Sequence, residues 1–479
     1  MDFAMSGFST ADLDKVFGPE SCGDTPEKRA RSSRREFVRG QTMLAEASAE
    51  ATGRRLAAAE ALANYGFEKL LAAVEEGQAP LVPGRSEPAR TIQSHRNALG
   101  YTPEELARLA KVDANDVVKA ETPGQVSPIR ILERLARPLA IDERILGFAT
   151  QGGTEELGVR LRELAAPQGN ARLTSTTVAA LAESAWVIGR QTSLLSMIGE
   201  RNTKSLETFQ VDDDYEYPTY ERGYRLAAQA RQLLGLPPEP PIKSMRSLVS
   251  SMLNIPLVQT TLSENLAGAT IAIGEVRGIV VNIQGRNRNV WVRRMTLAHE
   301  LGHMLWDPAE RLNRLTVDGY SDLTVDKYSD NSVIRRDPVE IRANAFAIAF
   351  LAPPSAVDKM VGHAEITPSA VFEVAQHFGI SVTAAAAHIG NVRRVEVVPP
   401  RGSKFPEPSD EMRGQEDFTI DYFPIKGIPP ALVGKFASIV AQAFREGLIS
   451  RDTAATFLQT TEDNISQDIM ESIINLTRR

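Results

Sequence analysis

The feature that most constrains the fold is the run from Thr296 to Trp306, which reads TLAHELGHMLW. His299 and His303 are four residues apart, so on an α-helix they lie on one face and can bind one metal ion. Glu300 lies beside them, displaced around the helix, where its carboxylate can hold a water molecule bound to that ion. This H-E-x-x-H spacing is typical of zinc peptidases.

The chemistry of such a site requires these residue types. Imidazole nitrogens bind zinc without neutralising its charge, so the ion stays a strong Lewis acid. The Glu300 carboxylate can take a proton from the attacking water and deliver it to the leaving amine. Apolar residues recur at helical spacing around the motif, namely Trp291, Met295, Ala298, Leu301 and Leu305. The alternative is that the two histidines and the glutamate only form ordinary hydrogen bonds on a half-buried helix.

Glu340 is the candidate for the third protein ligand that a catalytic zinc site needs beside an open position. It begins a predicted helix over residues 338–351 that is apolar nearly all round, which implies burial. A buried carboxylate needs a compensating cation. Arg342 is two residues away and points in another direction on a helix, which favours an external cation. Asn344, one turn after Glu340, is predicted to orient a ligand histidine.

Two segments, RMTLAHELGH at 294–303 and EIRANAFA at 340–347, resemble the ImmA/IrrE family of metallo-endopeptidases. The similarity extends over roughly 219–391 and includes the segment FGISV at 378–382. The resemblance implies an α+β zincin-like core of the gluzincin type. It also implies that the substrate is a partner repressor, cut at a specific bond.

The resemblance further implies the roles of the site residues. Zinc would be bound by His299, His303 and Glu340, and Glu300 would be the general base. Another divalent metal, such as manganese, is the alternative to zinc.

A second resemblance lies upstream. Residues 91–148 resemble an XRE-type (lambda-repressor-like) helix-turn-helix, with Thr102 predicted to cap the second helix through a capping box with Glu105. The third helix is expected from about Ala114 to Glu121 and would enter the major groove of DNA. Asn115 and Lys119 are the candidate base or phosphate contacts. The segments that carry this resemblance are Ile92, 99–102, 105–107, Val112, Val117, Glu121, Leu132, 135–136 and Leu139.

The charge of this module departs from that of a strong DNA reader. Its eight Lys and Arg residues are balanced by eight Asp and Glu residues. Attraction to phosphate, which supplies most non-specific affinity, would therefore be weak. A helical domain for protein docking or dimerisation is the alternative, because a fold alone does not determine a function.

Composition excludes several classes of protein. The net charge of −7 argues against a general nucleic-acid or membrane-surface binder. The single cysteine, Cys22, permits no intramolecular disulfide and no cysteine-based zinc finger, and it fits a reducing cytosol. The first twenty residues lack a secretory signal pattern, and the longest apolar stretch, 345–352, is far too short for a membrane span. We therefore expect a cytoplasmic protein.

The chain of 479 residues is long enough for several domains. We expect a multidomain, mainly α protein with an α+β metallopeptidase core. The predicted parts are an N-terminal extension with a long helix (1–90, mostly helical from about 35 to 76), the helix-turn-helix (91–150), a helical connector (151–218), the peptidase domain (219–395) and a C-terminal helical tail (396–479). Within the peptidase domain we expect helices at 220–234, 291–306 and 338–351, and two strands on either side of 274–275.

The preferred interpretation is a regulatory zinc endopeptidase that cleaves a partner repressor in a stress, mobile-element or defence response. The strand at 269–273 is expected to pair with an extended substrate. The alternative is a DNA-binding transcriptional regulator, or an antitoxin-like protein, whose metal site senses or stabilises. A purely structural zinc would need a fourth protein ligand. A homodimer is a further expectation for its assembly.

Overall fold

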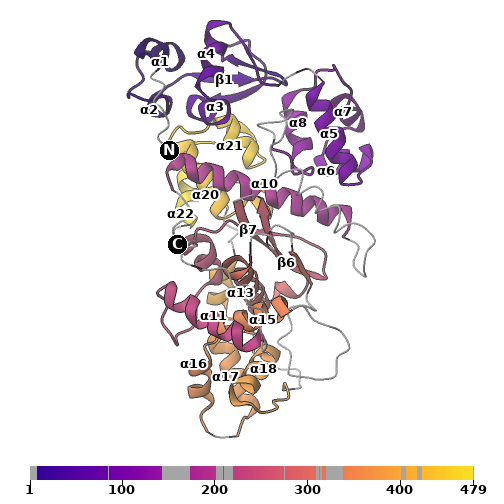
Figure 1. Ribbon diagram of the computed structural model, residues 1–479, viewed down its shortest axis with the longest axis vertical. Coiled ribbons are helices and arrows are strands. Elements are labelled where there is room, and N and C mark those ends of the chain that lie inside the picture. The colour runs from indigo at the N-terminus through magenta and orange to yellow at the C-terminus, as the bar shows by residue number, and fades with distance from the viewer. Residues whose placement is uncertain are drawn as a thin grey trace. The chain divides into compact units, whose positions relative to one another are not determined.

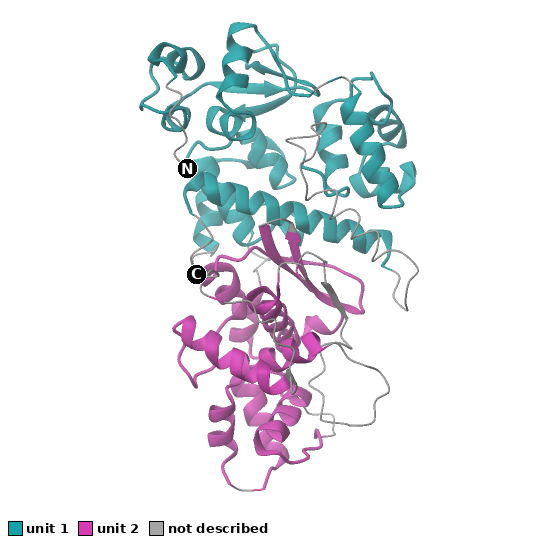
Figure 2. Cartoon of the chain, viewed as in Figure 1, with its two compact units in different colours: residues 1–200, 422–479 teal, residues 201–421 magenta. Residues whose placement is uncertain are grey.

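The structure is a computed structural model of the chain. It describes residues 8–82, 84, 86–142, 173–200, 209, 219–273, 276–308, 312, 316–319, 338–363, 365–400, 406–417 and 423–477. The chain divides into two compact units, which Figure 2 colours separately. Unit 1 comprises residues 1–200 and 422–479, and unit 2 comprises residues 201–421. Helices predominate, and within the described residues each unit contains one four-stranded sheet.

The N-terminal part of unit 1 corrects the prediction of a long helix between 35 and 76. Three strands, β1 (Glu36–Arg39), β2 (Met43–Glu46) and β3 (Arg54–Ala57), occupy its first half, and only α3 (Ala58–Tyr65) and α4 (Phe67–Glu75) are helical. With β4 (Ala79–Pro80), the strands form an antiparallel sheet in the order β3-β1-β2-β4. Helices α1 (Thr10–Phe17) and α2 (Pro26–Ser32) precede it.

Glycine and burial explain why strands form where helix propensity is high. Gly53 has a φ of +154°, and a Cβ on it would lie 2.5 Å from the carbonyl oxygen of Arg39 on the neighbouring strand. Each of the three strands contributes a buried side chain, namely Phe37, Leu44 and Leu56. Tertiary packing therefore overrides the intrinsic preference of a segment rich in Ala, Leu, Glu and Arg.

Four short helices follow, α5 (Glu87–Ala98), α6 (Pro103–Ala110), α7 (Ala114–Ala120) and α8 (Ile129–Ala136). The predicted capping box is confirmed: Thr102 Oγ1 accepts from the Glu105 amide at 3.2 Å, and Glu105 Oε2 accepts from the Thr102 amide at 3.0 Å. The predicted third helix corresponds to α7 within one residue. The XRE-type assignment itself stays a prediction.

Unit 1 is completed by helices from two distant parts of the chain. Helix α10 (Ser175–Ile198) buries Trp186, whose ring packs edge-on against Phe436 and Phe457. These two rings belong to α20 (Lys435–Arg445) and α21 (Arg451–Phe457), which α22 (Gln467–Thr477) follows. Of the predicted connector 151–218, most residues lie outside the described part of the chain.

Unit 2 combines a small sheet with a group of helices (Figure 1). Its strands, in the order β5-β7-β6-β8, are β5 (Leu257–Thr260), β6 (Leu266–Ile273), β7 (Val276–Asn282) and β8 (Thr316–Gly319). The predicted pair of strands around 274–275 is confirmed as the antiparallel pair β6–β7.

The helices of unit 2 confirm the three that were predicted in it. Helix α11 (Thr219–Leu233), α13 (Val290–Trp306) and α15 (Pro338–Leu351) match the expected bounds within one residue. Further α-helices among the described residues are α12 (Met245–Ser247), α16 (Pro354–Val361), α17 (Pro368–Phe378), α18 (Val382–Arg393) and α19 (Asp410–Glu416). Unit 2 thus contains the stretch predicted as the peptidase domain, 219–395, and continues past its end.

Helices α11 and α15 approach each other closely at a glycine. A Cβ on Gly223 of α11 would lie 2.5 Å from the carbonyl oxygen of Arg342 on α15. Among the helices that the structure describes, none combines the length and hydropathy that a membrane crossing requires.

Candidate metal centre

Helix α13 carries the H-E-x-x-H motif through the core of unit 2. Asn289 caps its first turn, where Oδ1 accepts from the Trp291 amide at 2.9 Å. His299, Glu300 and His303 are all buried, and Leu301 and Leu305 from the same helix lie in the hydrophobic core. The apolar residues on this helix therefore place the motif where water is largely excluded.

The structure brings Glu340 to the two histidines, as predicted. His299 Nε2 and His303 Nε2 are 3.0 Å apart, and Glu340 Oε2 lies 3.3 Å from the first and 3.4 Å from the second. Zinc bonds of about 2.0–2.1 Å at tetrahedral angles place ligand atoms roughly 3.3 Å apart. These three residues are the group in the described chain whose donor atoms lie close enough to share an ion.

The outer nitrogens of both imidazoles have partners that set their orientation. His299 Nδ1 lies 3.0 Å from Asn344 Oδ1, and His303 Nδ1 lies 2.8 Å from Asp307 Oδ2. Because both partners are acceptor oxygens, each Nδ1 donates, and each Nε2 presents its lone pair to the other and to Glu340. Two lone pairs and a carboxylate that face one point need a cation there, so the residues fit a bound metal ion.

The electrostatics of the site favour positive charge at this point. Burial alone would lower the pKa of His303, but the carboxylates of Asp307 and Glu340 raise it well above its usual value, so the Nε2 lone pair can take either a proton or a metal ion. Burial alone would raise the pKa of Glu340, but hydrogen bonds and charges from His299 and His303 hold it well below its usual range. The carboxylate is thus ionised and ready to bind a cation.

Glu300 lies against strand β6. Thr270 Oγ1 donates to Glu300 Oε2 at 2.6 Å, and both side chains are buried. The strand can come this close because position 268 is glycine: a Cβ there would lie 2.7 Å from Glu300 Oε1. Thr270 and Gly268 could not be predicted, because they lie far from the motif along the chain and no local spacing connects them to it.

Asp307 is a third residue of the site that was not predicted, although its spacing from His303 provided a signal. It follows His303 by four residues, the spacing that separates the two histidines, and so it shares their face of the helix. Its Oδ1 forms an ion pair with Arg342 of α15. The ion-pair partner of Arg342 is therefore Asp307. This contact agrees with the prediction that Arg342 points in another direction than Glu340.

Strand β6 has partners on both sides at Ala269 and Thr270, which corrects the expectation of substrate pairing for these two residues. For residues 271–273 the expectation stays a prediction. Strand β6 pairs with β7 on one side, and on the other Ala269 is in register with Val317 and Thr270 with Thr316 of β8. The β8 strand is the outer strand on this side of the sheet in the described part of the chain. The backbone groups of Ala269 and Thr270 are therefore already engaged within the sheet.

Asn115 and Lys119 lie in the other unit. Both are exposed on α7, and neither belongs to the metal centre. Their predicted role in DNA contact is independent of the site on α13.

Comparison with known proteins agrees with this geometry. Residues 292–389 match the peptidase M78 family, described as an IrrE N-terminal-like domain. No curated protein matches the chain. The matched region contains His299, His303 and Glu340, and the two findings together indicate a metallopeptidase. Residues 292–389 of this chain are therefore similar to an IrrE N-terminal-like domain, with a candidate metal site formed by two histidines and a glutamate.

Proposed function

We propose that the chain is a zinc-dependent endopeptidase. The observation that carries the proposal is the triangle of donor atoms from His299, His303 and Glu340, with edges of 3.0, 3.3 and 3.4 Å. Two imidazoles and one carboxylate are a common protein ligand set of catalytic zinc, which keeps a further position open. Zinc bound there supplies Lewis-acid activation of water and of the peptide carbonyl. Manganese is the alternative metal.

The side chains around the triangle divide the remaining work. Glu300 accepts a proton from the attacking water and delivers it to the leaving amine. Thr270 holds one oxygen of that carboxylate at 2.6 Å and so limits its rotation. Asn344 and Asp307 fix the orientation of the two imidazole rings, which keeps their Nε2 atoms directed at the ion.

We further propose that the substrate is a partner protein of the repressor class. The support is the similarity of residues 292–389 to the IrrE N-terminal-like domain and the resemblance to the ImmA/IrrE metallo-endopeptidases. Cleavage of such a partner would relieve the repression of genes that act in a stress, mobile-element or defence response.

The proposal is tested with the purified full chain and repressors encoded beside its gene. The wild-type protein should contain zinc and cut one of these repressors at a defined bond. Glu300→Gln should keep its metal and lose cleavage, because the ligands remain while the proton acceptor is removed. A Glu300→Gln variant that still cleaves would refute the assigned role of Glu300, and a metal-free, inactive wild-type protein would refute the function.

A regulator that binds DNA is the second candidate, supported by the exposure of Asn115 and Lys119 on α7. Under this alternative, Glu300→Gln preserves the biological output while Asn115→Ala and Lys119→Ala abolish it. The same pair of measurements therefore separates proteolysis from transcriptional control.

A further inference from the structure

A short segment beyond the matched region enters the core of unit 2. Residues 406–417, here called the clasp, contain α19 and end at Asp417. The match to the peptidase family ends at residue 389, so the clasp lies outside it. Glu416, the last residue of α19, is only 1% exposed.

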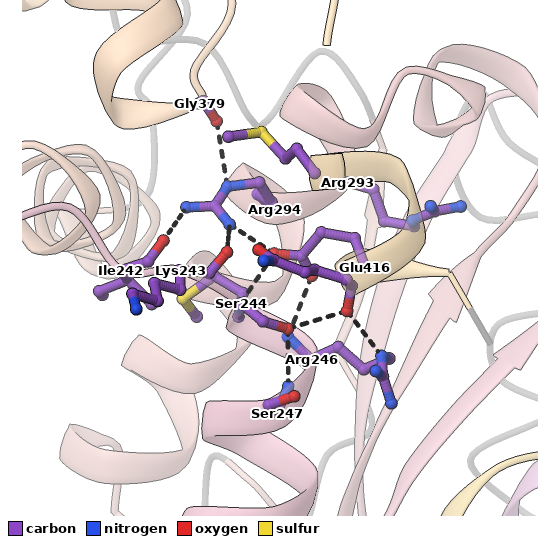
Figure 3. Close-up of polar contacts among 12 residues, drawn as sticks. Ile242, Lys243, Ser244, Arg246, Ser247, Arg293, Arg294, Gly379 and Glu416 are labelled. Atoms are coloured by element: carbon purple, nitrogen blue, oxygen red, sulfur yellow. Dashed lines mark hydrogen bonds and ion pairs between the residues drawn. The ribbon is translucent and has the colours of Figure 1, made fainter. Parts of the chain in front are cut away.

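The Glu416 carboxylate is fully engaged by other parts of unit 2 (Figure 3). It accepts from the backbone amides of Met245 at 2.8 Å and Arg246 at 3.1 Å, and it forms an ion pair with Arg294. The preceding carbonyl, of Gln415, accepts from Ser244 Oγ at 3.0 Å and from Arg246 Nε at 2.9 Å. The clasp is thus fixed to α12 and to α13 at once.

Arg294 is the point at which the clasp reaches the metal-binding helix. Its side chain is fully buried, and besides Glu416 it donates to the carbonyl oxygens of Ile242 at 2.7 Å, Lys243 at 3.2 Å and Gly379 at 3.2 Å. A buried guanidinium needs an anion, and Glu416 forms the ion pair with it. The clasp therefore supplies the countercharge of a residue on α13.

Two more contacts tie the clasp to the same helix. Trp291 Nε1 lies 3.1 Å from Met412 Sδ, and Arg293 forms an ion pair with Asp417. These three α13 residues precede His299 by five to eight positions. A rise of about 1.5 Å per residue places Arg294 roughly 7.5 Å along the helix axis from His299. A contact at Arg294 thus sets the depth and rotation of the histidines.

We infer that the clasp is part of the metal-binding unit and that Glu416 is a positioning residue, which acts through Arg294 to place His299 and His303. The inference rests on the proposed function for its metal site. It extends the working unit from the matched region to Asp417. Metal ligands must be held within a few tenths of an ångström, so loss of this anchor should weaken metal binding although no ligand is changed.

The test uses the full chain with Glu416→Gln, which removes the charge and keeps the size of the side chain. Glu411→Gln is the matched control, because Glu411 is an exposed carboxylate on the same helix. Cobalt(II) serves as the probe, since its visible absorption reports the geometry of the site. We expect Glu416→Gln to bind cobalt about tenfold more weakly, with an altered spectrum, and Glu411→Gln to match the wild type.

Hydrogen exchange of α13 provides a readout that needs no metal. We expect faster amide exchange in α13 of Glu416→Gln and unchanged exchange in α18. A folded Glu416→Gln protein with wild-type cobalt binding would overturn the positioning role, whatever its exchange. If the wild-type protein binds no cobalt, the proposed function fails. In that case, unchanged amide exchange in α13 of Glu416→Gln would separately overturn the positioning role of Glu416. If Glu416→Gln does not fold, Glu416→Asp, which withdraws the carboxylate by one methylene, is judged by the same two criteria.

Discussion

Asp307 connects the two helices that supply the metal ligands. Its carboxylate accepts from His303 Nδ1 at 2.8 Å with one oxygen and forms an ion pair with Arg342 of α15 with the other. We expect Asp307→Asn to weaken zinc binding about 10- to 100-fold, because the imidazole loses its charged partner and α15 loses its ion pair. Competition with a chelator of known affinity measures the change.

A matched control is Asp358→Asn, which removes a carboxylate paired with Arg393 at the surface of the same unit. This variant should bind zinc as the wild type does. Equal zinc affinity of Asp307→Asn and Asp358→Asn would contradict the role assigned to Asp307.

Thr270 is predicted to matter for turnover and not for metal binding. Its hydroxyl donates to Glu300 at 2.6 Å, and this hydrogen bond involves none of the three proposed metal ligands. We expect Thr270→Val to lower kcat about tenfold, the equivalent of one hydrogen bond of roughly 1.4 kcal/mol, and to leave zinc content unchanged. Thr270→Ser should restore most of the rate. A Thr270→Val enzyme with full kcat on the cleaved repressor would disprove the contribution.

At the scale of residues, the sequence permits prediction where the spacing is local. His299, Glu300 and His303 share one helical turn, and Glu340 and Asn344 share another, so helical periodicity finds each set. Thr270 and Glu416 reach the site only through tertiary folding, 30 residues before Glu300 and 122 residues after Arg294. No periodicity in a single sequence links positions so far apart.

At the scale of elements, the contact between α11 and α15 depends on Gly223. A Cβ at this position would lie 2.5 Å from a backbone carbonyl oxygen of Arg342, which cannot move aside as a side chain can. We expect Gly223→Ala to destabilise the protein by about 2 kcal/mol, although alanine has the higher helix propensity. Urea unfolding followed by circular dichroism measures the difference.

Gly189 provides the matched control for this substitution. It lies inside α10, and a Cβ there would meet nothing within 4 Å. Gly189→Ala should therefore stabilise its unit by about 0.5–1 kcal/mol. A Gly223→Ala protein that is as stable as Gly189→Ala would show that α11 and α15 are not in close contact.

Long helices with a continuous apolar pattern could be predicted, and short strands could not. Helices α13 and α15 are predicted within one residue because their patterning extends over three or more turns. Strands β1, β2 and β3 have four residues each, and they exist because of pairing across the sheet. Their composition favours helix, so only the long-range contacts decide their structure.

At the scale of the whole molecule, His388 in unit 2 and Glu60 in unit 1 each make a pH-dependent contribution to stability, and the two contributions have opposite signs. In unit 2, His388 is fully buried between Tyr224, whose hydroxyl lies 2.7 Å from Nδ1, and the carbonyl oxygen of Ala352, 2.7 Å from Nε2. Burial lowers the pKa of His388 from 6.5 to about 4. As the pH falls, His388 therefore binds a proton in the unfolded chain before it does so in the folded one. The free energy of unfolding consequently decreases by about 3 kcal/mol between pH 6.5 and 4.

Thermal unfolding of His388→Gln across this range checks the effect. The difference in stability between wild type and variant should shrink as the pH falls from 6.5 to 4, because the wild type alone carries this proton linkage. A difference that stays constant with pH would contradict the assigned pKa of His388.

In unit 1, the contribution of Glu60 to stability depends on pH in the opposite direction. Its carboxylate accepts from Thr453 Oγ1 at 2.8 and 2.9 Å, and burial raises its pKa from 4.5 to about 7 against the opposing charge of Arg54. Glu60 contributes about 3 kcal/mol to the free energy of unfolding below pH 4.5, and this contribution is lost as the pH rises through 7. Glu60→Gln should remove this slope, which differential scanning calorimetry between pH 4.5 and 7.5 would detect; an unchanged slope would refute it.

The organisation of the chain explains why its division could not be predicted from local patterns. Unit 1 is assembled from residues 1–200 and 422–479, so only the later part of the segment predicted as a C-terminal tail (396–479) packs with the N-terminal part, whereas its first part, to residue 421, belongs to unit 2. The buried ion pair of Arg54 with Asp452, at 2.9 Å, joins these two parts. Composition changes along a sequence indicate where segments begin, but they do not indicate which distant segments share a core.

The central claim is that two helices of unit 2 hold one metal ion through His299, His303 and Glu340. The most direct measurement is the zinc content of the full chain after dialysis, compared with Glu340→Gln and Glu300→Gln. We predict one zinc ion per chain in the wild type and in Glu300→Gln, and loss of zinc from Glu340→Gln. Full zinc content in Glu340→Gln, or no zinc in the wild type, would contradict the claim.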